Sequence, residues 1–210
     1  VTPSCSKAWV EASPGALCCW TSEQNPPGDF FRTRPFEDHM KNFAFVFPGQ
    51  GSQAVGMLDA WGDHPEVVGT LAEASDALGE NIGHLIHDGP KELLSLTTNT
   101  QPVMLVASVA AWRVWRAEGG ALPSVLAGHS LGEYAALVAS GVLTLAQAAP
   151  LVRFRAAAMQ DAVPVGTGAM AAILGMDTQR VIAGCAEAQA SFGADSAEVV
   201  EAVNFNDPAQ

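Results

Sequence analysis

Residues 128–132 read Gly-His-Ser-Leu-Gly, and this pentapeptide predicts the local fold more directly than any other part of the chain. It fits G-x-S-x-G, the pattern that places a serine on a tight turn between a strand and a helix. A side chain on either glycine would clash in so sharp a turn. Residues 121–127 form a short apolar run, and residues 131–139 read as a helix with Glu133 in its first turn, where the helix dipole favours an anion. Together these signals favour a nucleophilic Ser130 over a merely glycine-rich turn.

The composition indicates a globular chain. Of its 210 residues, 49% are hydrophobic and 15% are charged, which is enough apolar material for a substantial core. The longest apolar run, residues 102–112, is too short to span a bilayer, and residues 1–20 lack the pattern of a secretory signal. The formal net charge of -12 argues against binding to nucleic acid. We therefore expect neither a membrane nor a nucleic acid among the partners.

The cysteines indicate a reducing compartment. They stand at positions 5, 18, 19 and 185, a spacing that fits neither a metal site nor a disulfide framework. We therefore expect a cytoplasmic protein without a bound cofactor or metal.

The first 39 residues differ in texture from the rest. They hold three of the four cysteines and two of the five tryptophans, with no sustained period of 2 or 3.6. The pattern changes at Met40. We expect residues 1–39 to be an extension that is disordered or not natively translated.

Hydrophobic periodicity predicts the elements of the remaining chain. A strand at 43–47 leads into a glycine-rich turn at 48–53. Helices are expected at 65–78, 82–87, 90–96, 101–117 and 131–139, and from a cap at Thr144 to Asp161 with an irregularity at Pro150. Strands at 169–174 and 198–205 are then expected to flank a helix at 178–190. One face of this βαβ-like unit would be uncovered, so we expect the unit to be incomplete.

Several motifs, in order along the chain, resemble the malonyl-CoA:acyl-carrier-protein transacylase family. The two long signatures are Phe-Val-Phe-Pro-Gly-Gln-Gly-Ser-Gln at 45–53 and Gly-His-Ser-Leu-Gly-Glu-Tyr at 128–134. Shorter matching stretches are Met-Gln at 159–160, Gly-Ala-Met-Ala-Ala at 168–172 and Val-Asn-Phe-Asn at 203–206. The resemblance covers residues 40–210 and the N-terminal part of that family.

The resemblance implies an α/β fold. Its α/β-hydrolase-like core would have a parallel sheet and a nucleophile elbow, with an inserted ferredoxin-like subdomain. Residues 40–167 would then be part of the acyltransferase core, and residues 168–210 the incomplete start of the insert. The chain is therefore expected to be truncated at its C-terminus.

The resemblance also implies a mechanism. Ser130 would attack the thioester of malonyl-CoA, the acyl donor, and pass the malonyl group to the phosphopantetheine thiol of acyl carrier protein in fatty acid biosynthesis. This fold class takes one oxyanion donor from the backbone N–H after the nucleophile, here that of Leu131. The family takes the second donor from the glutamine of the first glycine-rich loop, which maps to Gln50.

Three further residues are expected at the substrate site. Arg155 matches the family's arginine for the free malonyl carboxylate, which a planar guanidinium can hold with two parallel bonds. Arg153, two residues earlier, should face elsewhere as a solvated charge. His129 is expected to line the site rather than to act as the base. Asn204 either lines the site or caps a turn.

The catalytic base is not expected among these residues. His39, His64, His84 and His87 lie in the extension or on peripheral helices, and no histidine follows Ser130. In this fold the histidine comes after the nucleophile, and the family's histidine lies well downstream. Losing the base costs on the order of 10⁴ to 10⁶ in rate. The chain alone is therefore expected to be nearly inactive, and the complete enzyme to be a monomer.

Alternative functions remain open. A serine esterase or thioesterase would share Ser130 but would have no need of Arg155. The acyltransferase domain of a modular polyketide or fatty-acid synthase would share most of the motifs, and a non-catalytic fragment would also fit the missing base. Residues 49–54 formally match a dinucleotide fingerprint, but the acidic residue wanted about 20 positions later falls in a helical stretch.

Charge also bears on the carrier protein. Residues 40–210 carry 7 basic and 17 acidic side chains, and acyl carrier proteins are themselves acidic. Docking should therefore need a local basic patch and be sensitive to salt.

Overall fold

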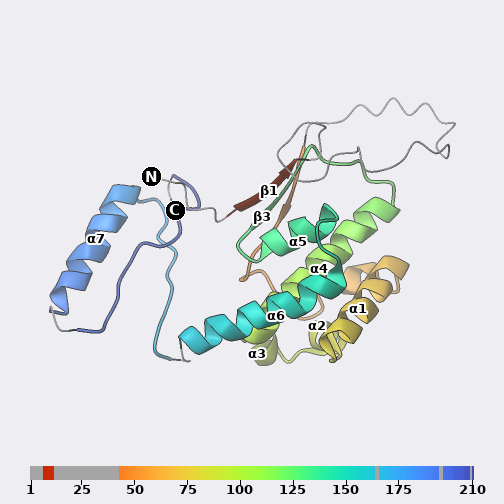
Figure 1. The fold of residues 1–210 in the computed structure, drawn as a ribbon, viewed down its shortest axis with the longest axis horizontal. Coiled ribbons are helices and arrows are strands. Elements are labelled where there is room, and N and C mark those ends of the chain that lie inside the picture. The colour runs from red at the N-terminus through yellow and green to blue at the C-terminus, as the bar shows by residue number, and fades with distance from the viewer. Residues whose placement is uncertain (1–6, 12–42, 164–165, 194–195, 209) are drawn as a thin grey trace. The chain divides into compact units, whose positions relative to one another are not determined.

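The computed structural model describes residues 7–11, 43–163, 166–193, 196–208 and 210. The chain divides into two units, Val1–Val163 and Pro164–Gln210. Among the described residues, the first unit holds a small sheet and six α-helices, and the second unit holds one α-helix (Figure 1). The expected α/β class is confirmed.

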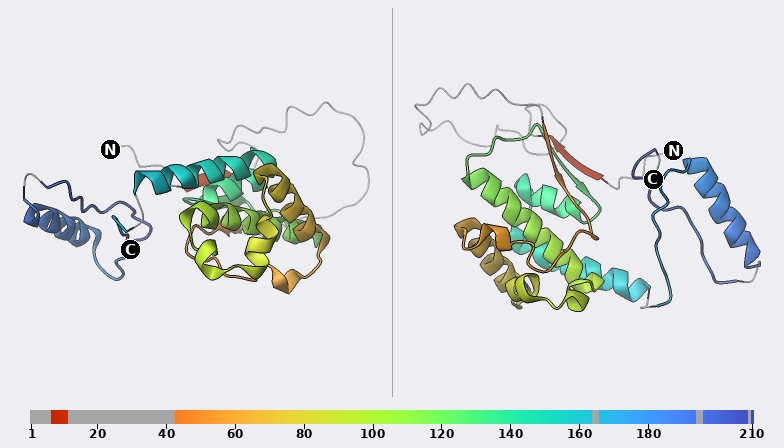
Figure 2. Two further views of the ribbon diagram at one scale, coloured as in Figure 1. Left: turned by 90° about the horizontal axis from the view of Figure 1, so that it is seen from below. Right: turned by 180° about the vertical axis from the view of Figure 1, so that it is seen from behind.

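The sheet has three strands in the order β1-β3-β2. Strands β2, Ala44–Phe47, and β3, Val125–His129, are parallel, as expected for strands joined by a long helical crossover. Strand β1, Lys7–Glu11, pairs antiparallel with the other edge of β3 (Figure 2). The strand expected at 43–47 is therefore confirmed. Strand β1 lies where the sequence shows no strand period, because its pairing depends on the distant β3.

The helices of the first unit follow the predicted order. They are α1 (Pro65–Leu78), α2 (Ile82–Asp88), α3 (Lys91–Leu94), α4 (Thr97–Ala117), α5 (Gly132–Ala139) and α6 (Leu145–Ala162). The predicted cap of α6 is confirmed: Thr144 Oγ1 accepts a bond from the backbone N–H of Gln147, whose side chain bonds back to the N–H of Thr144.

Helix α4 begins before the expected start at Gln101 because Pro102 does not interrupt it. Proline has no N–H, so the carbonyl four residues earlier, that of Thr98, lacks its helical donor. Arg153 on α6 donates a bond to this carbonyl from Nη1. The helix therefore runs through the proline with the help of a distant side chain.

Arg153 is not the solvated charge that the sequence suggested, and that expectation is wrong. Its side chain is 26% exposed and forms an ion pair with Glu80. It also donates to Asn99 Oδ1 over 2.9 Å. Burial lowers the pKa of this guanidinium from its ordinary value. Arg153 therefore ties α6 to the segments before α2 and at the start of α4.

Helix α4 forms the centre of the first unit's core. Residues 100–110 are all buried, and the helix contacts α1, α5 and α6. Trp112 packs edge-on against Phe45 and Phe47 of β2, with ring centroids 5.1 and 6.5 Å apart. The expectation that this apolar helix is buried is confirmed, and its aromatic end anchors the sheet.

The second unit contains α7, Thr178–Ser191, where the sequence predicted a helix. The strands expected at 169–174 and 198–205 are wrong, because both stretches are irregular. A stretch with strand-like composition forms a strand only where a second strand bonds its backbone. Here Gln189 of α7 bonds the carbonyl of Glu198 and the N–H of Val200, each over 2.7 Å.

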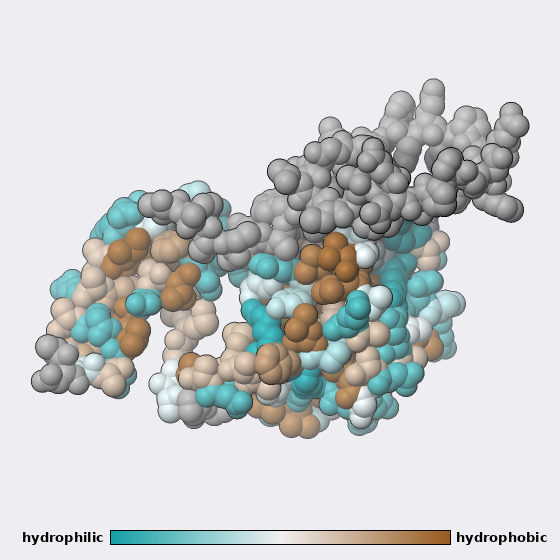
Figure 3. Space-filling view, in the orientation of Figure 1, coloured by the Kyte–Doolittle hydropathy of each residue, from teal (hydrophilic) through white to brown (hydrophobic). Residues whose placement is uncertain are grey.

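Apolar side chains reach the surface of the first unit. Figure 3 shows brown apolar atoms among polar ones on the face turned to the viewer. On α6, Leu151 is 44% exposed and Phe154 is 71% exposed. Within the described ranges, no helix has the length and apolar character needed to cross a membrane.

Candidate active site

Ser130 lies on the sharp turn between β3 and α5, as the sequence predicted. Its φ is 53°, and it is the one non-glycine residue with a positive φ in the described part of the chain. An L-residue in this region is strained, and such strain gathers at functional sites. Ser130 thus stands in a strained conformation between a strand and a helix, which is the geometry of a nucleophile elbow.

The two flanking glycines are required by contact. A Cβ on Gly128 would lie 2.0 Å from the carbonyl group of Gly132, and one on Gly132 would lie 2.2 Å from the carbonyl oxygen of Phe47. Strand β3, the first turn of α5 and the end of β2 therefore meet at backbone distance. No other residue type fits at these two positions without moving the elbow.

Arg155 reaches this serine from the middle of α6. Its Nη2 donates a hydrogen bond of 3.0 Å to Ser130 Oγ. The guanidinium also lies 5.9 Å from the ring centre of Tyr134, on α5. The structure therefore brings together the predicted nucleophile and the predicted substrate-binding arginine.

Gln101 is a site residue that sequence reasoning missed. It lies on α4 and is 0% exposed, and its Oε1 accepts a hydrogen bond from Arg155 Nη1. Its Nε2 donates to Met159 Sδ over 3.3 Å. The available signal was an amide directly before the apolar run at residues 102–112.

His129 and Glu133 flank the elbow. Burial raises the pKa of the Glu133 carboxyl above its ordinary value, while the nearby charges of Arg155 and His129 oppose that rise. A Cβ on Gly49 would lie 3.0 Å from the carbonyl oxygen of His129 and 3.3 Å from its Nδ1. His129 therefore sits between the elbow and the glycine-rich loop.

The predicted oxyanion donors lie on the two sides of this contact. Leu131 is buried and is the N-cap of α5, so its N–H is among those that a helix start leaves without a helical partner. Gln50 follows Gly49 and is exposed, with its Nε2 3.5 Å from Thr97 Oγ1. The loop backbone adjoins His129, while the Gln50 side chain is turned to the start of α4.

The peripheral histidines are paired with carboxylates. His64 bonds Glu118 over 3.1 Å, His84 bonds Asp88 over 2.7 Å, and His87 bonds Asp59 over 2.6 Å. His39 lies outside the described residues.

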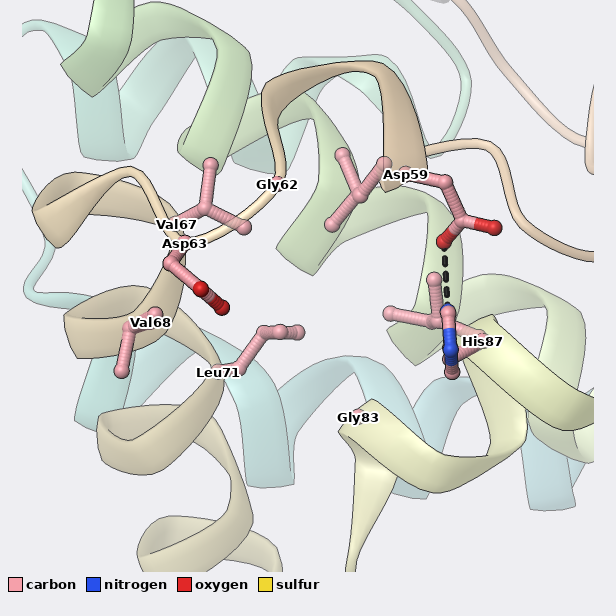
Figure 4. Close-up of a pocket in the computed structure, with 10 residues that line it drawn as sticks. Asp59, Gly62, Asp63, Val67, Val68, Leu71, Gly83 and His87 are labelled. Carbon is pink, nitrogen blue, oxygen red and sulfur yellow. Dashed lines mark hydrogen bonds and ion pairs between the residues drawn. The ribbon is translucent and has the colours of Figure 1, made fainter.

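The His87–Asp59 pair lines a separate hollow between α1, α2 and the 3-10 helix at Asp59–Trp61. Figure 4 shows this pair on one wall and Asp63 on the other. Val67, Leu71 and the other lining residues include none of the predicted site residues.

The remaining expectations concern Asn204 and metals. Asn204 is an exposed residue of the second unit, and its role stays a prediction. Among the described residues, no group of three or more His, Cys, Asp or Glu side chains could hold a metal ion.

Comparison with known proteins identifies relatives of the whole arrangement. Residues 44–201 match the family described as "Acyl transferase domain". The malonyl CoA-acyl carrier protein transacylase of Escherichia coli (strain K12) is 53% identical over 172 residues, which are 81% of this chain and 54% of that protein. The chain thus spans about half the length of the curated relatives it matches.

Solved structures agree with this comparison. An acyl-carrier-protein S-malonyltransferase from Burkholderia pseudomallei is 64% identical, with a TM-score of 0.73 over 80% of this chain and 53% of that one. A second structure shows a type II PKS acyl-carrier protein in complex with its malonyl-transacylase. The matching chain of that structure is 50% identical, with a TM-score of 0.73 over 80% of this chain and 53% of that one.

Proposed function

This chain belongs to the acyl transferase domain family, and on that premise we propose that the complete protein transfers a malonyl group from malonyl-CoA to the phosphopantetheine thiol of acyl carrier protein. One observation carries the proposal: Arg155 Nη2 lies 3.0 Å from Ser130 Oγ. A nucleophile with a fixed cation beside it suits an acyl group that carries a free, charged carboxylate in addition to its thioester carbonyl.

The reaction proceeds in two acyl transfers. Ser130 Oγ bonds to the thioester carbonyl carbon and loses its proton, the carbon–sulfur bond breaks, and CoA leaves as the thiol. The carrier's thiol then bonds to the same carbon of the malonyl-serine ester, and Ser130 regains its proton as the carbon–oxygen bond breaks. Each transfer passes through a tetrahedral oxyanion, for which we propose the N–H groups of Leu131 and Gln50 as donors.

Arg155 selects the acyl group. Its guanidinium pairs with the free carboxylate of malonyl and leaves an acetyl group without a matching contact. Sites built on such a bond reject the analogue that lacks it by roughly 10⁴ to 10⁵. His129 lines the site beside the elbow, and Asn204 is proposed to complete it.

The proton of Ser130 needs a base. The described histidines at 64, 84 and 87 form ion pairs with Glu118, Asp88 and Asp59. Because the chain spans about half the length of its relatives, we assign the base to the remainder of the complete protein. The same remainder would complete the α/β-hydrolase-like core and the ferredoxin-like insert begun at residues 168–210. The exposed apolar side chains of α6 support such a packing partner.

The proposal of an acyl carrier protein as the partner is supported by a similar protein. The similar malonyl-transacylase was solved with a type II PKS acyl-carrier protein, which supports an acyl carrier protein as the acceptor here, in fatty acid or polyketide synthesis. A serine esterase would not need Arg155 beside the nucleophile.

Mass spectrometry of the complete protein tests the function. Brief exposure to malonyl-CoA should add one malonyl group, mapped by peptide to Ser130, and acetyl-CoA should add little. Holo acyl carrier protein should then remove the group as malonyl-carrier, with Ser130→Ala as the unlabelled control. Loss of the group as free malonate at the same rate without carrier would favour the esterase, and a folded wild type without any adduct would refute acyl transfer at Ser130.

A further inference from the structure

We propose that Gln101 is a positioning residue that holds Arg155 in the orientation that binds the free carboxylate of the acyl group. The inference rests on the proposed function and deepens it. It starts from one contact: the fully buried Gln101 accepts a hydrogen bond at Oε1 from Arg155 Nη1.

The orientation of the Gln101 amide is set from both ends. Arginine only donates, so the amide oxygen must face Arg155. The other end of the amide donates to Met159 Sδ over 3.3 Å, and a thioether only accepts. Both polar ends of a buried group are therefore satisfied, and a flipped amide would place donor against donor.

Three elements then fix the guanidinium. Gln101 on α4 takes Nη1, Ser130 at the elbow takes Nη2, and the ring of Tyr134 on α5 lies 5.9 Å away. Arginine has five N–H donors, so donors remain for a substrate carboxylate. A guanidinium that is already oriented loses less freedom when it binds.

The neutral charge of Gln101 is as important as its shape. A glutamate at this position would also accept from Arg155, but it would form an ion pair and offset the charge that attracts the malonyl carboxylate. A methionine would keep the volume and lose the acceptor. The two substitutions therefore separate the charge from the hydrogen bond.

Acylation of Ser130 by malonyl-CoA and acetyl-CoA, measured in the complete protein, gives the first readout. Gln101→Glu should raise KM for malonyl-CoA about 10- to 100-fold, because an offset charge weakens the carboxylate contact. Gln101→Met should lower malonyl kcat/KM about 10-fold. Both substitutions should lower the ratio of malonyl to acetyl transfer. Gln179→Glu, the same charge change at an exposed position in the first turn of α7, is the matched control and should change nothing.

The exchange rate of the Arg155 guanidinium protons, followed by NMR, gives a readout that needs no activity. Gln101→Met should speed this exchange about 10-fold, while thermal melting confirms that the variant is folded. Unchanged exchange together with unchanged malonyl-to-acetyl ratios would overturn the inference. A wild type that is not malonylated refutes the proposed function instead, and the exchange rates still decide whether Gln101 holds Arg155.

Discussion

Arg155 Nη2 donates a 3.0 Å hydrogen bond to Ser130 Oγ. The two residues stand 25 positions apart in the chain, on the middle of α6 and at the β3–α5 turn. Their contact places a fixed cation beside the proposed nucleophile.

Replacing Arg155 should change which acyl group is transferred. Arg155→Ala removes the proposed partner of the malonyl carboxylate, a loss of about 2–5 kcal/mol. This corresponds to a fall of about 30- to 4,000-fold in malonyl kcat/KM, while acetyl transfer rises relative to it. Arg155→Lys should fall in between, because a lysine is a point charge without the planar fork. Steady-state kinetics with both thioesters checks the change, and unchanged selectivity in Arg155→Ala would refute the role. Arg116→Ala, at the end of α4, is the control.

The strained backbone at Ser130 should lower the free energy of unfolding. Its φ of 53° is strained for a residue with a Cβ and comfortable for glycine. Ser130→Gly should therefore be more stable than Ser130→Ala by about 1 kcal/mol, although both lose acylation. Urea denaturation of the complete protein measures the two free energies of unfolding. Equal values would show that the elbow relaxes without its hydroxyl.

The elbow should tolerate no side chain at Gly132. Gly132→Ala places a Cβ 2.2 Å from the carbonyl oxygen of Phe47, so the free energy of unfolding should fall by about 3 kcal/mol or more. Gly69→Ala is the matched control, since an added Cβ there meets nothing within 4 Å in the exposed middle of α1. It should stabilise the protein by about 0.5–1 kcal/mol. A Gly132→Ala protein with wild-type stability would contradict the close contact of β2 and α5.

The pKa of His87 should be raised above its ordinary value. The hydrogen bond to Asp59 raises the pKa of His87 above 6.5, and the charges of Asp59 and Asp88 add to the rise. A raised pKa in the folded state gives stability that is fully present below pH 6.5 and is lost as pH rises through the raised value. Proton NMR should therefore show a raised pKa for His87, and Asp59→Asn should return it toward 6.5.

Asp63→Asn provides the control for that titration. Asp63 lies on the opposite wall of the same hollow (Figure 4). The substitution removes one negative charge, as Asp59→Asn does, but leaves the His87–Asp59 hydrogen bond in place. It should leave the His87 titration nearly unchanged. An equal shift in both variants would mean that the negative charge around the hollow, rather than the hydrogen bond to Asp59, raises the pKa of His87.

Features that depend on neighbours in sequence could be predicted from the sequence. The elbow follows from two glycines around Ser130, and the start of α6 follows from the Thr144 cap. The buried α4 follows from its apolar composition. In each case the residues that fix the backbone lie within a few positions of one another, so the pattern contains the physical cause.

Features that depend on distant partners could not be predicted in this way. Nothing near Thr98 shows that Arg153 will replace the helical donor missing at Pro102. Residues 169–174 and 198–205 are short, largely apolar stretches that read as strands, but Gln189 takes backbone bonds of the second stretch. A strand is completed by a partner strand, which a local apolar stretch does not supply.

The sequence by itself determined the family and the elbow, and it predicted Ser130 and Arg155 as site residues, because long motifs and local backbone constraints are written in adjacent residues. Only the tertiary structure decided that Arg155 meets Ser130, and that Gln101 is the buried amide behind it. These contacts form when α4, α5 and α6 pack together, and packing between helices far apart in the chain fixes side-chain partners that no local pattern records.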